Sequence, residues 1–160
     1  MLALALLPGL IAGCAERHGG FGIGDQEDPA LSGNGRLLAT VVERGGRRSV
    51  RVIERSTDRE LPLRGLRRHT PHRSPSLSWS GRYLALIRQR GERREVVVLD
   101  RFNGRLRPLA LPGDRLPERV SLSPDGQRLA LQLLRQGQLD VELFRLPDLE
   151  PDQPAGSPLR

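Results

Sequence analysis

Residues 76–85 read SLSWSGRYLA, and two similar stretches occur elsewhere in the chain. Residues 30–39 read ALSGNGRLLA, and residues 121–130 read SLSPDGQRLA. The serine that precedes each turn moves from Ser32 to Ser78 to Ser123, which are steps of 46 and 45 residues. Self-similarity at a fixed period of this length is the sequence signature of a repeat architecture.

Each repeat unit is expected to contain about four β-strands. A glycine recurs between two apolar segments in every unit, at Gly45, Gly91 and Gly137. In the second unit the alternating and β-branched runs predict strands over 75–78, 82–89, 95–100 and 106–109, with a hairpin turn at Asn103-Gly104. Four antiparallel strands in about 45 residues are typical of a β-propeller blade. The sequence therefore predicts an all-β fold of three four-stranded antiparallel β-propeller-type blades, in an open or incomplete propeller.

The repeated turns resemble a known propeller signature. Residues 78–85 (SWSGRYLA) and 122–130 (LSPDGQRLA) look like the Trp-Ser-Pro-Asp-Gly-x-x-Leu-Ala motif of the WD-like repeats of the TolB family, over about residues 29–147. The resemblance implies six blades in the family and work in Tol-type envelope maintenance or transport. Three blades leave sheet edges that must be covered, which predicts a homodimer or an edge-bound partner.

The N-terminus indicates an address in the cell envelope. Residues 1–12, MLALALLPGLIA, are apolar but shorter than the roughly 20 residues that span a bilayer as a helix, as in a secretory signal. Residues 10–14, LIAGC, resemble a bacterial lipobox, which implies lipid attachment at Cys14, the only cysteine. Ala15 after it favours outer-membrane sorting, on the periplasmic side. The alternative is a buried N-terminal helix with an inert cysteine.

These observations divide the chain into segments. We expect a lipoprotein signal peptide at 1–13, a flexible tether at 14–28, blades at 29–74, 75–119 and 120–147, and a disordered Pro-rich tail at 148–160.

The charge is strongly basic. All 26 basic residues are arginine and face 19 acidic residues, for a net charge of +7. Aromatic residues make up only 3% and no recognition motif appears, so nucleic acid is not expected as a partner. Residues 64–73, RGLRRHTPHR, form a basic loop that could bind lipid headgroups, phosphates or cell-wall carboxylates, or simply be solvated. The candidate anion-binding residues are Arg64, Arg67, Arg68, His69, His72 and Arg73.

No catalytic residue, metal site or cofactor is expected. The single cysteine excludes an intrachain disulfide, and His69-x-x-His72 has no acid or cysteine nearby to complete a metal site. The repeated serines have no histidine at a repeated offset, which favours a scaffold role. The leading hypothesis is a non-catalytic, lipid-anchored envelope protein that binds a protein or peptidoglycan. The alternatives are a cytoplasmic basic module that binds anionic polymers, and a glycan- or peptide-binding accessory domain of an enzyme.

Overall fold

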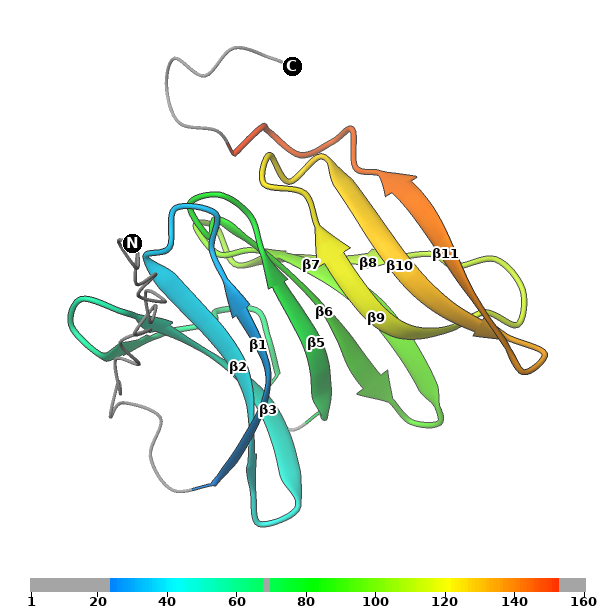
Figure 1. The fold of residues 1–160 in the computed structure, drawn as a ribbon, viewed down its shortest axis with the longest axis horizontal. Coiled ribbons are helices and arrows are strands. Elements are labelled where there is room, and N and C mark those ends of the chain that lie inside the picture. The colour runs from blue at the N-terminus through cyan, green and yellow to red at the C-terminus, as the bar shows by residue number, and fades with distance from the viewer. Residues whose placement is uncertain (1–23, 68–69, 153–160) are drawn as a thin grey trace, which may run out of the picture.

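The computed structural model describes residues 24–67 and 70–152, which form eleven strands in three antiparallel sheets and no helix (Figure 1). Blade 1 has the order β1-β2-β3-β4, with strands at Asp25–Leu31, Leu37–Arg44, Arg47–Glu54 and Arg59–Leu61. Blade 2 has the order β5-β6-β7-β8, with strands at His72–Leu77, Tyr83–Arg90, Arg93–Asp100 and Arg105–Leu109. Blade 3 contains β9, β10 and β11, at Leu116–Leu122, Arg128–Arg135 and Gln138–Arg145.

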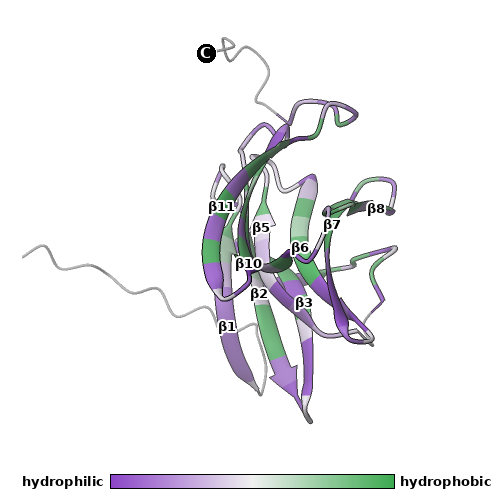
Figure 2. Ribbon diagram, turned by 90° about the vertical axis from the view of Figure 1, so that its right-hand side faces the viewer, coloured by the Kyte–Doolittle hydropathy of each residue, from purple (hydrophilic) through white to green (hydrophobic). Residues whose placement is uncertain are grey.

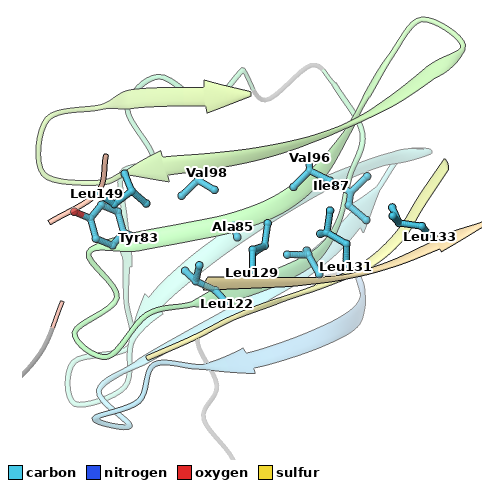
Figure 3. Close-up of a cluster of buried hydrophobic side chains, with 11 residues drawn as sticks. Tyr83, Ala85, Ile87, Val96, Val98, Leu122, Leu129, Leu131, Leu133 and Leu149 are labelled. Atoms are coloured by element: carbon cyan, nitrogen blue, oxygen red, sulfur yellow. The ribbon is translucent and has the colours of Figure 1, made fainter. Parts of the chain in front are cut away.

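The predicted all-β arc of three blades is confirmed, and the sheets do not close into a ring. Blade 3 has three strands in the described part of the chain, whereas blades 1 and 2 have four. The reason is that the chain after β11 does not return beside this strand. It crosses instead toward blade 2, where Leu149 is buried among the side chains of blades 2 and 3 (Figure 3).

Two predicted boundaries need correction. Strand β1 begins at Asp25, inside the 14–28 segment expected to be a tether, because its backbone pairs with β2 as far as Glu43. Leu149 and Asp152 are buried, although 148–160 was expected to be a disordered tail. The described fold therefore extends beyond 29–147 on both sides, while the predicted signal peptide and Cys14 lie outside the described residues.

The burial pattern of each strand follows from the place of its blade in the arc. In blade 2, residues 83–87 of β6 and 96–100 of β7 are all buried, because both faces of this sheet are covered by a neighbouring blade. In blade 3, β10 alternates: Leu129, Leu131 and Leu133 are buried and the residues between them are half-buried. Only one face of blade 3 is therefore packed against another blade.

We call the face that a blade turns toward the next blade in the chain its leading face, and the opposite face its trailing face. The leading face of blade 1 packs on the trailing face of blade 2 through Leu37, Ala39, Val50, Val52, Leu77, Leu84, Leu86 and Leu99. The leading face of blade 2 packs on the trailing face of blade 3 through Tyr83, Ala85, Ile87, Val96, Val98, Val120, Leu122, Leu129, Leu131 and Leu133 (Figure 3). Both interfaces are almost wholly aliphatic, as the composition requires.

The inner strands β5 and β9 add hydrogen bonds between blades 2 and 3. The Ser74 and Ser76 hydroxyl oxygens of blade 2 accept the backbone N–H groups of Val120 and Leu122, at 3.0 and 2.9 Å. Such bonds satisfy inner-strand N–H groups and hold the two blades in one register.

The arc has two distinct ends, because antiparallel strands alternate in direction. The β2–β3, β6–β7 and β10–β11 hairpins lie at one end, which we call the hairpin end. The turns at 32–36, 78–82 and 123–127 lie at the other, the turn end. Strand β1 starts at the hairpin end, since Asp25 pairs with Glu43.

Gly126 at the turn end offers a test of blade packing. It has a φ of +74°, and an added Cβ would lie 2.5 Å from a ring carbon of Tyr83. Gly137 has a similar φ of +84° but open space around it. We predict that Gly126→Ala lowers the free energy of unfolding by roughly 2–3 kcal/mol and Gly137→Ala by about 1 kcal/mol, as measured by urea unfolding. Equal losses would show that Tyr83 imposes no steric constraint.

Candidate functional site

The predicted anion-binding residues do not form one cluster. Arg64 lies against Gly104, at the turn end, whereas Arg67 lies with Thr70 and Arg88 toward the hairpin end. Arg68 and His69 lie outside the described residues.

His72 is a buried residue of β5 and not a surface cation. Its Nδ1 accepts the backbone N–H of Val50 at 3.2 Å, and its Nε2 lies 3.2 Å from the Thr70 hydroxyl, which donates to the Arg67 carbonyl. Burial and the nearby Arg88 lower the pKa of His72 to about 4. The imidazole is therefore neutral near pH 7, and its interpretation as an anion-binding group is corrected to a structural one.

The half-buried arginines at the hairpin end are paired with carboxylates. Arg48 contacts Glu27 at 2.9 Å and Glu43 at 3.0 Å. Arg73 and Arg94 both form ion pairs with Glu118. Arg73, which was predicted to bind an anion, is therefore already paired with a carboxylate of the protein. Ion pairs with this much solvent exposure contribute little to stability, but they neutralise the charges of these arginines.

A hollow of about 340 Å³ is the part of the predicted anion site that the structure retains. Arg67, Thr70, Arg88 and Arg90 are among the residues that line it. Glu95 binds Arg88 at 2.8 Å and Arg90 at 3.4 Å, and Arg67 and Arg90 are the exposed cations of the group. A guanidinium beside a hydroxyl suits a phosphate or carboxylate ligand.

Within residues 24–67 and 70–152, no three histidine, cysteine, aspartate or glutamate side chains are grouped to hold a metal ion. The same residues contain no helix long and apolar enough to cross a membrane.

The repeated serines build the turns of the turn end. Ser32 donates to Asn34 Oδ1 at 2.8 Å and accepts the N–H of Leu37 at 2.9 Å. Ser123 makes the corresponding bonds, donating to Asp125 and accepting from the N–H of Arg128. In both turns an Asn or Asp oxygen two residues after the serine closes the turn. These serine hydroxyls therefore stabilise the turns, which is the scaffold role that their repetition predicts.

The middle turn lacks this oxygen, because Ser80 stands where the other turns have Asn34 and Asp125. Asp152, from the chain after β11, supplies it. Its carboxylate accepts the hydroxyls of Ser78 at 2.5 Å and Ser80 at 2.6 Å, and the backbone N–H of Ser80 at 2.9 Å. Sequence reasoning missed Asp152; the missing Asn or Asp at position 80 was the available signal.

Residues 147–152, which we call the C-terminal latch, fasten blade 2 to blade 3. Leu149 enters the core between the two blades, and the Glu150 carbonyl accepts the Tyr83 hydroxyl at 2.9 Å. The Leu149 carbonyl accepts the side-chain amide of Gln127, and the Asp152 N–H donates to the Asp125 carbonyl. One repeat earlier, the corresponding residues include the start of β8, so the latch overlaps the part of the repeat that forms the fourth strand of blade 2.

No protein-family model matches this sequence, and no match was found among curated proteins. Solved structures do share the fold. TolB from Acinetobacter baumannii is similar with a TM-score of 0.59 at 20% identity, over 76% of this chain and 30% of that chain. A protein assigned as TolB from Agrobacterium tumefaciens has a TM-score of 0.64 at 13% identity, over 76% and 46%.

The β-propeller domain of the Trilobed protease from Pyrococcus furiosus is also similar, with a TM-score of 0.59 at 15% identity, over 80% of this chain and 41% of that chain. The chain spans less than half the length of each of these proteins. At these identities the similarity establishes a TolB-like β-propeller fold.

The latch predicts a stability effect at Asp152. Asp152→Ala removes the acceptor for two hydroxyls and one N–H in a buried turn, so we expect a loss of about 2 kcal/mol in the free energy of unfolding. The control is Asp148→Ala, whose exposed carboxylate is 3.9 Å from Arg107, with an expected loss below about 0.5 kcal/mol. Similar losses for the two variants in urea unfolding would contradict the role of the latch.

His72 predicts a pH dependence of stability. The unfolded imidazole takes up a proton as the pH falls below about 6.5, whereas the folded one stays neutral until about 4. Its contribution is therefore complete above pH 6.5 and is lost between these values, by about 3 kcal/mol. Between pH 7 and pH 4, we expect wild type to lose about 2–3 kcal/mol more than His72→Gln in urea unfolding. An unchanged difference would contradict a neutral, buried His72.

Proposed function

We propose that this protein is a non-catalytic, lipid-anchored cell-envelope protein whose TolB-like blades form a scaffold that binds a protein or peptidoglycan. The observation that carries the proposal is the lipobox-like LIAGC at residues 10–14, directly after an apolar run and followed by a propeller-type repeat. The outer membrane, on its periplasmic side, is the proposed location, since Ala15 follows the cysteine.

The position of β1 supports this arrangement. Asp25 lies 11 residues after Cys14, a length that reaches at most about 40 Å when fully extended. Because β1 starts at the hairpin end, a lipid on Cys14 would hold this end toward the membrane. The hollow at Arg67 lies toward the same end, where phosphate headgroups or cell-wall carboxylates would be its ligands.

A scaffold role is also supported by what the polar side chains do. Ser32 and Ser123 donate hydrogen bonds within their own turns, Ser78 donates to Asp152, and His72 is held by Val50 and Thr70. None of these groups is left as a nucleophile or base in the described structure. Peptide binding as an accessory domain is the second candidate, because one similar structure is the propeller domain of a protease.

Mass spectrometry of the protein purified from bacterial membranes tests the proposal. We expect a mature chain that begins at Cys14 and carries the mass of a diacylglyceryl group and an added acyl chain, because a dual lipid signal is needed for stable anchoring. The control is the variant Cys14→Ser. This variant should lack the lipid mass and should no longer be found in the membrane fraction. An intact, unmodified Met1 on the wild-type chain would contradict the lipid anchor.

A further inference from the structure

Blade 3 exposes the face that the other two blades bury. Val141 and Leu143 of β11 are 71% and 79% exposed. One repeat earlier, Val96 and Val98 occupy the same positions on β7 and are 0% and 3% exposed, because the trailing face of blade 3 covers them. In blade 1 the corresponding pair, Val50 and Val52, is buried under blade 2.

The polar part of the same interface is also present on blade 3. Ser76 of blade 2 accepts the N–H of Leu122 from blade 3, and Ser121 is its counterpart one repeat later. Ser121 is exposed on β9, near Val141 in the hollow that both line. The leading face of blade 3 thus keeps the aliphatic pair and the hydroxyl that blade 2 uses to hold its neighbour.

Blade 1, the first blade of the arc, carries part of the complementary face. Leu31 on the trailing side of blade 1 is 56% exposed, whereas its counterparts Leu77 and Leu122 are buried at the blade interfaces. Leu38, the counterpart of Leu84, is half-buried. Val42 and Ile53 on the same face are already buried, so Leu31 and Leu38 are the apolar residues that remain available for contact.

Exposed apolar side chains are otherwise scarce. The five large ones in the described residues are Leu31, Phe102, Leu139, Val141 and Leu143. Leu139, Val141 and Leu143 share one side of β11, where hydrophobic and hydrophilic bands alternate along the strand (Figure 2). Phe102 lies over the guanidinium of Arg82 in blade 2, the middle blade. The remaining four lie on the two terminal blades.

We infer that the leading face of blade 3 binds the trailing face of blade 1 in a second copy of this chain. The contact continues the blade-to-blade packing already present twice within the chain. Made twice between two copies, it closes a ring of six blades, within the four to eight of closed propellers. The proposal does not depend on acylation of Cys14.

Net charge does not oppose this head-to-tail pairing. The strands and turns of blade 1, residues 25–61, contain 7 arginines and 7 acidic residues, and those of blade 3, residues 116–145, contain 4 arginines and 4 acidic residues. Both blades are therefore formally neutral, and no net repulsion acts between the two faces that meet. Pairing of two blade 3 faces would instead leave Leu31 exposed, and pairing of two β11 edges about Val141 would place Asp140 opposite Glu142.

The oligomeric state of the full chain carrying Cys14→Ser tests the proposal, by size exclusion with light scattering over a range of concentrations in a non-ionic detergent. We expect a dimer, with its dissociation constant raised about 100-fold by Leu143→Glu and also by Leu31→Glu. Val141→Ser is a milder variant of the same face. The control is Phe102→Glu, on the middle blade. Phe102 is 77% exposed but lies on neither of the two faces that pair, so this variant should leave the dimer unchanged.

Mixing the two variants gives a second measurement. Leu143→Glu keeps an intact blade 1 face and Leu31→Glu keeps an intact blade 3 face, so an equimolar mixture should regain one interface and associate more tightly than either variant alone. A monomer at every concentration would overturn the proposal. So would a dimer that Leu143→Glu breaks and Leu31→Glu does not, since that result indicates pairing of two blade 3 faces.

Discussion

Face-to-face packing of aliphatic strands is the interaction on which the rest of this structure depends. A twisted sheet of three or four strands cannot bury its own faces, so each blade is stable only against a neighbour. Blade 2 is covered on both sides, and five consecutive residues of β6 are buried as a result. Blades 1 and 3 have only one neighbour each. The same requirement that builds the core therefore leaves two unfinished faces at the ends of the arc.

Polar bonds at the turn end set how the blades meet. Each turn needs one Asn or Asp oxygen to satisfy its serine hydroxyl and backbone N–H groups. Blades 1 and 3 provide this oxygen from within the turn, through Asn34 and Asp125. Blade 2 receives it from Asp152, which makes the end of the described chain part of the middle blade. With the latch bound to blade 2, β11 has no outer neighbouring strand within the described part of the chain.

The two ends of the arc differ in what they can contact. The hairpin end holds the start of β1 and the hollow at Arg67, so the proposed lipid on Cys14 would face this end toward the membrane. The turn end is occupied by the latch and its hydrogen bonds. The exposed apolar residues of blades 1 and 3 lie on the faces of these blades, between the hairpin end and the turn end. An anchor and a ring closure are therefore compatible in one molecule.

The blade is specified by local sequence. The period of the serine turns and the alternation within each unit specify strands and hairpins, because those depend on residues close together in the chain. The roles of Arg64, His72 and Asp152 depend instead on contacts between distant parts of the chain. Arg64 lies against Gly104 and apart from the hollow at Arg67, burial removes the charge of His72, and Asp152 acts 72 residues away from Ser80. Exposure of Val141 was also a tertiary outcome, since its counterpart Val96 has the same side chain and the opposite environment. What covers a face depends on the neighbouring blade, and local sequence does not specify that neighbour.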